Sequence, residues 1–173
     1  ERLAPFKILK SIEVDILNDG QLDYDDEVLA SLDLVIASVH SNLKMSEEKA
    51  MARLLTAIAH PRTTILGHLT CRLLLSRPGY PIAHKTIIDA CAQHKVAIEI
   101  NAHPRRLDID WEWIPYALEK GVHLSINPDA HSIEGFDDIY YGVMAAQKGG
   151  LQANQNLSSY SLIALEAYLQ SKK

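Results

Sequence analysis

Residues 12–17 (IEVDIL) and 34–40 (LVIASVH) begin a series of five short apolar runs, which continues at 64–69 (TILGHL), 96–101 (VAIEIN) and 123–127 (HLSIN). The runs are rich in Ile, Val and Leu, and most of them do not alternate cleanly between apolar and polar residues. This pattern is typical of strands that are covered on both faces, as in a parallel sheet. We therefore expect five parallel strands.

Amphipathic stretches separate these runs. The clearest predicted helix follows Ser46, with Glu47 and Glu48 in its first turn and apolar residues at helical spacing behind them. Further helices are expected at 24–32, 82–94, 110–120, 136–147 and 159–171. Strands and helices that alternate along one chain predict an α/β fold with right-handed crossovers. This alternation alone does not distinguish a barrel from an open sheet.

The composition is that of an ordinary globular protein. The chain has 173 residues, of which 47% are apolar and 23% charged, so we expect one domain over 1–173 and no disordered, collagen-like or coiled-coil structure. A net charge of −5 argues against a free-standing nucleic-acid binder. No signal peptide or membrane-spanning run is evident, and two cysteines suggest a reducing, cytoplasmic setting. Because the chain opens almost on a strand, we expect a fragment.

Ionisable side chains cluster at the ends of the predicted strands. Glu13 lies inside the first run, His40 closes the second, His68 lies near the end of the third, and Asp129 and His131 follow the fifth. In parallel α/β folds the carboxyl ends of the strands form one face, where ligands bind. We therefore expect these five residues to lie near one rim.

Imidazoles and carboxylates together form a ligand set suited to Zn, Mn or Fe. Such ions lower the pKa of a water molecule and polarise phosphoryl oxygens, so a phosphoester can be hydrolysed near neutral pH without a nucleophilic side chain. Simpler interpretations stay open for each residue taken singly. A histidine at a strand end can bond to the backbone, Glu13 can pair with a Lys or Arg, and Asp15 faces the same side as Glu13.

Other chemistries find less support in the sequence. There is no G-x-S-x-G, H-E-x-x-H or Gly-rich phosphate loop, and Cys71 and Cys91 have the contexts of packing residues. Arg72, Arg105 and Arg106 follow two candidate ligand strands, so they are either phosphate contacts or solvated surface side chains.

The motifs resemble those of a known family. Residues 11–17 (SIEVDIL), 37–41 (ASVHS), 65–68 (ILGH) and 129–132 (DAHS) are similar to the PHP (polymerase and histidinol phosphatase) domain, while 72–75 (RLLL) and 99–108 (EINAHPRRLD) look like the version at the C-terminus of bacterial family X DNA polymerases. The resemblance covers essentially the whole chain, in the family's order and approximate spacing.

The resemblance implies a distorted (β/α)7 TIM-like barrel with up to three divalent metals, of which this chain would hold the last five βα units. Glu13 would bridge the first and second metals, and His40 and His68 would complete the second. Asp129 would bind the first metal and His131 the third. The implied activity is metal-dependent phosphoester hydrolysis, which in the polymerases means 3′-5′ exonuclease and end processing of DNA. Arg72, Arg105 and Arg106, with His103 as a further substrate-side candidate, would contact the substrate.

The chain departs from the family pattern at its start. The H-x-H strand and the second ligand motif, which precede the bridging glutamate in the family, are absent, so we expect one complete metal shell and weak or no activity from this chain alone. A barrel without two strands exposes edges, which predicts self-association or a complementary chain. Leu69 and Cys71 also replace residues that are often Pro and Gly in the family, and His103 stands where Asn is common.

Three functions follow from this interpretation. The first is the phosphoesterase domain of a family X polymerase, with DNA as the partner through the polymerase and no membrane partner. The second is a stand-alone PHP phosphatase of the histidinol-phosphatase type, acting on a small phosphomonoester. The third is a non-catalytic scaffold or DNA-placing domain with a structural metal.

Overall fold

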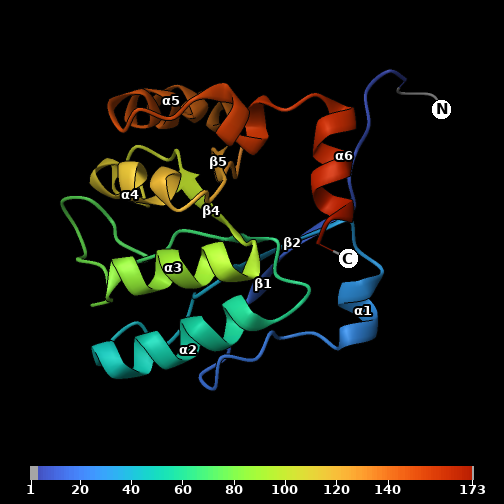
Figure 1. The fold of residues 1–173 in the computed structure, drawn as a ribbon. Helices are drawn as coiled ribbons and strands as arrows, with labels where there is room; N and C mark the ends of the chain where they lie inside the picture. Colours follow the sequence, from blue (N-terminus) through green and yellow to red (C-terminus); the bar gives the residue numbers. More distant parts are fainter. Residues whose placement is uncertain (1–3, 173) are drawn as a thin grey trace.

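The computed structural model describes residues 4–172 and contains a parallel sheet of five strands in the order β1-β2-β3-β4-β5 (Figure 1). The strands are β1 (Ser11–Asp15), β2 (Leu34–Ser38), β3 (Ile65–Leu66), β4 (Ala97–Asn101) and β5 (Leu124–Asn127). Each strand pairs in parallel with the next along the chain. The predicted α/β class and all five predicted strands are therefore confirmed.

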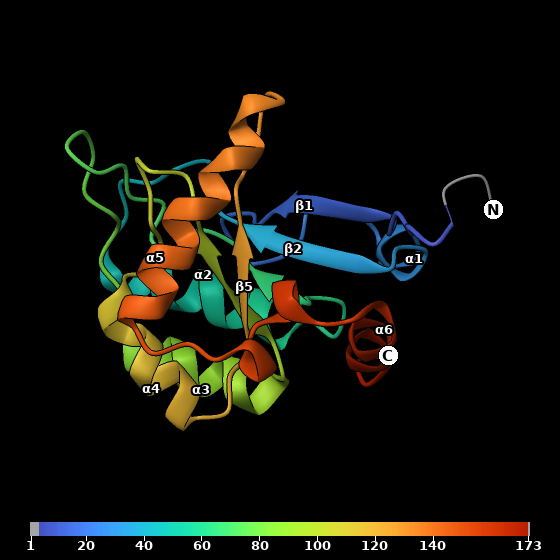
Figure 2. The same cartoon turned by 90° about the horizontal axis from the view of Figure 1, so that it is seen from above.

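The sheet curls strongly along this order. Figure 2 shows β5 running across the direction of β1 and β2, while the carboxyl ends of the strands stay on one side of the molecule. Within residues 4–172, β1 and β5 each have a single strand neighbour. The arrangement is compatible with part of a TIM-like barrel, and it places the residues that follow the strands along one curved rim.

In the described part of the chain six α-helices accompany the strands: α1 (Asp26–Ala30), α2 (Glu47–Ala59), α3 (His84–His94), α4 (Ile114–Glu119), α5 (Ile139–Lys148) and α6 (Leu162–Gln170). Ser46 caps α2 as predicted, since its hydroxyl accepts a hydrogen bond from the backbone N–H of Lys49 at 3.3 Å. The helix predicted over 110–120 is divided, because Asp110 caps a 3₁₀ turn that precedes α4. No helix among these residues is long and apolar enough to cross a membrane.

The larger hydrophobic core lies between the sheet and the layer formed by α2, α3 and α4 (Figure 1). Val14 and Ala37 from the strands are fully buried in it with Ile58 of α2 and Ile87 of α3. Each large apolar side chain buried in this way contributes roughly 1.5–3 kcal/mol. Cys91 lies in the same core, in agreement with the packing role predicted for it.

A smaller apolar cluster covers the opposite face of the sheet. Ile65 and Ala97 pack there against Leu157, and Leu165 and Tyr168 of α6 lie over them. Figure 2 shows α6 near the end where β1 and β2 begin. This half of the face is thus closed by apolar contacts, and the polar residues discussed below lie toward the carboxyl ends of the strands.

Candidate metal centre

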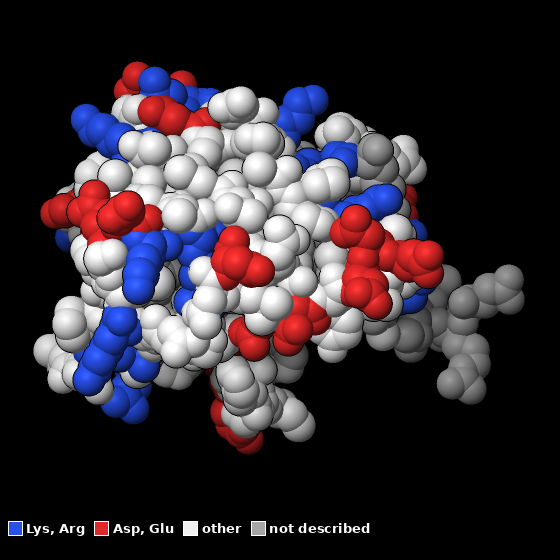
Figure 3. All heavy atoms as spheres, turned by 90° about the horizontal axis from the view of Figure 1, so that it is seen from below, with Lys and Arg blue, Asp and Glu red and all other residues white. Residues whose placement is uncertain are grey.

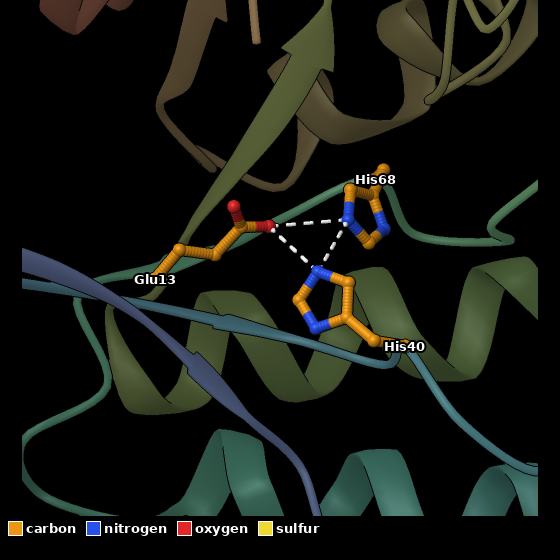
Figure 4. A group of neighbouring side chains, drawn as sticks. All are labelled: Glu13, His40 and His68. Atoms are coloured by element: carbon orange, nitrogen blue, oxygen red, sulfur yellow. Dashed lines mark hydrogen bonds and ion pairs between the residues drawn. The ribbon is translucent and has the colours of Figure 1, made fainter. Parts of the chain in front are cut away.

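Three side chains converge at the carboxyl ends of β1, β2 and β3. Glu13 lies within β1, His40 lies two residues after the end of β2, and His68 lies two residues after the end of β3 (Figure 4). Glu13 Oε1 lies 3.1 Å from His68 Nε2 and 3.3 Å from His40 Nε2, and the two Nε2 atoms are 3.2 Å apart. The sequence-predicted residues of the second metal therefore lie together.

This geometry fits a divalent cation. Ligands at about 2.0–2.1 Å from a tetrahedral zinc ion are about 3.3 Å from one another, close to the separations observed here. Two imidazole nitrogens that face each other at 3.2 Å repel unless a proton or a metal ion lies between them. Within residues 4–172, this is the only group of three or more His, Cys, Asp or Glu side chains close enough to share an ion.

Asp15 holds the ring of His40 in place. Its carboxylate forms a hydrogen-bonded ion pair with His40 Nδ1, which leaves Nε2 directed at Glu13. A carboxylate behind a ligating imidazole fixes its tautomer and increases its basicity. Asp15 and Glu13 lie on the same side of β1, as the sequence indicated. Their contacts differ, because Glu13 contacts both histidines, whereas Asp15 contacts only His40.

His68 is held from its backbone. The side chain of His68 is only 2% exposed, and its backbone N–H donates to Glu99 Oε2 at 2.7 Å. The preceding Gly67 passes so close to β2 that a Cβ there would lie 2.2 Å from Ser38 Oγ. Glycine therefore permits the close approach that brings His68 to the cluster.

The cluster shifts the pKa values of its own members. Hydrogen bonds from His40 and His68 hold the pKa of Glu13 far below its usual range. Burial lowers the pKa of His68, but its neighbours Cys71 and Glu13 raise it to about 10 overall. Without a metal His68 thus retains a proton that balances the carboxylate, and a bound cation would take the place of that proton.

Glu99 is the functional residue that sequence reasoning missed. It lies in β4, is 5% exposed, and accepts hydrogen bonds from His68 N, from Asn127 Nδ2 at 2.8 Å and from Asn101 Nδ2 at 3.2 Å. Asn101 Nδ2 also donates to Asp129 Oδ2 at 3.1 Å. Glu99 therefore connects the three-residue cluster to the end of β5. A carboxylate in the apolar run VAIEIN was the available signal.

Asp129 and His131 lie outside the three-residue cluster. Asp129 faces Asn101 and pairs with Arg106 Nε at 3.4 Å. His131 has a side chain 86% exposed, and its Nδ1 lies 2.8 Å from the backbone oxygen of Asp129. The roles of these two residues as ligands stay predictions.

The arginines predicted to contact substrate differ in how far their own chain engages them. The guanidinium of Arg72 donates to Asp110 Oδ2 at 2.6 Å and to the backbone oxygens of Arg106 and Leu107, so it binds its own chain. Arg105 is exposed, and its backbone N–H donates to His103 Nδ1 at 3.2 Å. Arg105 is thus better placed than Arg72 to meet a ligand.

Cys71 occupies an unusual backbone position. Its φ of 55° lies in the left-handed region that favours glycine. Its Sγ lies 3.4 Å from a guanidinium nitrogen of Arg77 and 3.8 Å from one of Arg106. The predicted packing role holds in that the residue is buried, although its neighbours include charged groups as well as the core.

The chain is similar in sequence to known proteins that are named as a polymerase/exonuclease and as probable phosphatases. No family model matches the chain. It is 46% identical to "DNA polymerase/3'-5' exonuclease PolX" of Bacillus subtilis (strain 168) over 165 residues, which are 95% of this chain and 29% of that protein. It is 36% identical to "Probable phosphatase YcdX" of Escherichia coli O81 (strain ED1a) over 97 residues, 54% of this chain and 37% of that protein.

A third relative is matched along most of its length. The chain is 30% identical to "Probable phosphatase Teth514_1060" of Thermoanaerobacter sp. (strain X514) over 183 aligned positions, which cover 100% of this chain and 72% of that protein. The chain thus spans less than a third of the polymerase and nearly three quarters of this phosphatase.

Proposed function

The chain belongs to the PHP family and is homologous to the PHP region of PolX, and from this premise we propose that it is the metal-dependent phosphoesterase domain of a family X DNA polymerase. The substrate we propose is the 3′ end of DNA, shortened by phosphodiester hydrolysis. The observation that carries the proposal is the convergence of Glu13, His40 and His68 in a chain 46% identical to an exonuclease-polymerase.

Glu13, His40 and His68 would hold one divalent ion, Zn or Mn, with Fe also suited to these ligands. When bound, the ion supplies Lewis-acid stabilisation of phosphoryl charge and lowers the pKa of a water molecule. Asp15 keeps His40 in the ligating tautomer, and Glu99 holds the backbone of His68. We propose that Asp129 and His131 serve further ions, up to three in the intact domain.

The exposed Arg105 is the arginine that we propose to contact substrate phosphate, together with His103 beside it. We propose that Arg106, which pairs with Asp129, also contacts substrate phosphate. Arg72 was expected to contact phosphate, but its engaged guanidinium supports a positioning role for the 106–110 segment instead.

The second candidate function is a PHP phosphatase acting on a small phosphomonoester. It is favoured by the alignment with the Thermoanaerobacter probable phosphatase, which covers 72% of that protein and all of this chain. A scaffold without hydrolytic activity is the remaining alternative.

The test is hydrolysis by the purified chain in Mn²⁺ or Zn²⁺, with a 5′-labelled DNA strand and p-nitrophenyl phosphate as parallel substrates. From this chain alone we expect at most a weak, metal-dependent ladder of shortened DNA, lost in the His40→Ala, His68→Ala double variant. Hydrolysis of the monoester without shortening of DNA would support the phosphatase instead. Equal DNA hydrolysis by the double variant would mean that the activity does not come from this cluster, and would contradict the proposal.

A further inference from the structure

A hollow of about 490 Å³ lies at the carboxyl ends of β1 and β2, the ends at which the metal cluster also lies. It is bounded by the loops that follow β1 and β2 and by the first turns of α2. The residues that line it are Asn18, Asn42, Lys44, Met45, Lys49, Ala52 and Arg53. Asn42 follows His40 by two residues, so one short loop separates the hollow from the cluster.

Arg53 places a buried positive charge in the wall of the hollow. The residue is 2% exposed, and its guanidinium donates to the backbone oxygens of Ile16, Leu17 and Ser41. Carbonyl oxygens accept these hydrogen bonds without neutralising the charge. Among residues 4–172 no carboxylate forms an ion pair with Arg53, and the carboxylate of Asp15, which interacts with the Arg53 charge, is engaged by His40. A buried cation without an acid favours an anion nearby.

Lys44 and Lys49 add two further cations at the mouth of the hollow. Neither side chain forms an ion pair or a hydrogen bond with any residue in the described part of the chain. Seen from below, Lys and Arg side chains lie at the left of the molecule, the side on which α2 begins, and others lie along its top and right, with acidic side chains among them (Figure 3). Glu47 and Glu48 stand at the start of α2, but neither lines the hollow.

Two amides complete the polar lining. Asn42 Nδ2 donates to Asn18 Oδ1 at 3.0 Å, which ties the two loops together across the hollow. Asn18 then has its own amide N–H groups to offer a ligand. Cations and amide donors around an open hollow of this size match the oxygens of a phosphate group, which accepts hydrogen bonds and carries negative charge.

We propose that this hollow is a second phosphate subsite, occupied by a phosphate of the substrate strand next to the one hydrolysed at the metal cluster. The inference rests on the proposed function, and it specifies the substrate class. A small phosphomonoester has a single phosphate and cannot fill both positions, whereas a polynucleotide strand has phosphates at regular intervals. The hollow therefore favours the polynucleotide substrate over the phosphomonoester.

The test is binding of a short 5′-fluorescein-labelled single-stranded DNA to the purified chain, followed by fluorescence anisotropy at several NaCl concentrations. EDTA is present, so that the metal cluster does not contribute. The Lys44→Gln, Lys49→Gln double variant should bind about 10-fold more weakly, and its slope of log affinity against log salt should fall by about 0.7 for each strand phosphate that the lysines no longer neutralise. The matched control is Lys95→Gln, Lys120→Gln, which removes two charges beyond the ends of α3 and α4 and should bind like wild type.

Several results would overturn the inference. These are no strand binding by wild type, an equal loss in both double variants, or unchanged binding by Lys44→Gln, Lys49→Gln. A titration with inorganic phosphate, monitored by the amide NMR signals of Asn18 and Asn42, distinguishes free phosphate from a phosphate of a strand. Lysine-dependent binding of inorganic phosphate without strand binding would overturn the assignment to a strand.

The inference and the proposed function fail separately in this design. The His40→Ala, His68→Ala variant should keep its lysine-dependent strand binding in EDTA, because the subsite does not require the metal. Loss of hydrolysis with strand binding retained would count against the proposed function only. Metal-dependent hydrolysis with no contribution from the lysines to strand binding would count against the subsite only.

Discussion

Two regions of the rim carry histidine and carboxylate side chains, and these side chains converge in one region but not in the other. At β1–β3, Glu13, His40 and His68 point at one another with ligand atoms 3.1–3.3 Å apart. At the end of β5, Asp129 is turned to Asn101 and Arg106, and His131 is exposed to solvent. Similar sequence motifs thus give an assembled cluster in one place and separate residues in the other.

The difference lies in what supports each side chain. His40 has the carboxylate of Asp15 behind its ring, and the backbone of His68 is anchored by Glu99. Among the described residues, His131 contacts only Asp129 of its own segment, through the backbone oxygen and, at 3.7 Å, the carboxylate. A ligand presented by adjacent strands and held by a second group is preorganised, whereas one on a free segment needs a further partner to fix it.

Removing the assembled cluster should have the largest effect. The His40→Ala, His68→Ala variant loses two of three ligands, and we expect Zn²⁺ or Co²⁺ affinity to fall on the order of 1,000-fold or more. Isothermal titration calorimetry of both proteins checks this. Affinity within a factor of a few of wild type would mean that the ion binds elsewhere.

Glu99→Gln should weaken the support without removing a ligand. The amide cannot accept from all three donors that Glu99 satisfies, so we expect metal affinity to fall roughly 10–100-fold. The control is Ser125→Ala, whose hydroxyl reaches only the far end of the network through Asn127. Equal metal affinities for the two variants would show that Glu99 has no positioning role.

Arg72→Ala separates structural from substrate-binding arginines. Because Arg72 binds three acceptors of its own chain, we expect a loss of about 1–3 kcal/mol in the free energy of unfolding, measured by urea denaturation. Arg105→Ala should leave that free energy within about 0.5 kcal/mol of wild type and weaken DNA binding instead. The reverse pattern would restore Arg72 as the phosphate contact.

The stability of the metal-free chain and its affinity for metal should change in opposite directions with pH. In the metal-free chain the pKa of His68 is raised from its usual 6.5 to about 10, so its proton contributes stability that is complete below pH 6.5 and is lost as the pH rises toward 10. Metal binding displaces this proton, so metal affinity should rise over the same window, by up to about 10-fold per pH unit. Melting temperatures in EDTA, and calorimetric affinities across this range, check both signs. A pH-independent affinity would contradict proton displacement.

His131→Ala should have the smallest effect. Because its side chain is exposed and lies outside the cluster, the affinity for the first equivalent of metal should change less than about 2-fold. A drop as large as that of a single cluster histidine would mean that the end of β5 closes onto the ion when the metal binds.

Much of the fold followed from local patterns. The five apolar runs and the capped helix after Ser46 appear as predicted, because burial on both faces and capping are encoded within each segment. The division of the 110–120 helix was missed, because the side chain of Asp110 starts a 3₁₀ turn there. The rule that parallel strands bring their carboxyl ends together predicted that Glu13, His40 and His68 lie near one rim, and the family resemblance singled them out as the ligands of one metal.

What escaped prediction depends on tertiary contacts. Nothing local distinguishes Asp15 as a support from Glu13 as a ligand, since both lie on the same side of β1. The roles of Glu99 and Arg72 follow from partners about 30–40 residues distant in the chain. Such pairings arise only when the curled sheet brings the loops after β3 and β4 together.

The most direct test of the central claim is a crystal structure of the chain grown with Zn²⁺ or Mn²⁺, with data collected at the absorption edge of the metal. We predict one strong anomalous peak at about 2.0–2.2 Å from Glu13 Oε1, His40 Nε2 and His68 Nε2, with Asp15 still against His40 Nδ1. A peak at Asp129 and His131 with none at the cluster would contradict the claim, and so would a metal-free cluster under saturating ion.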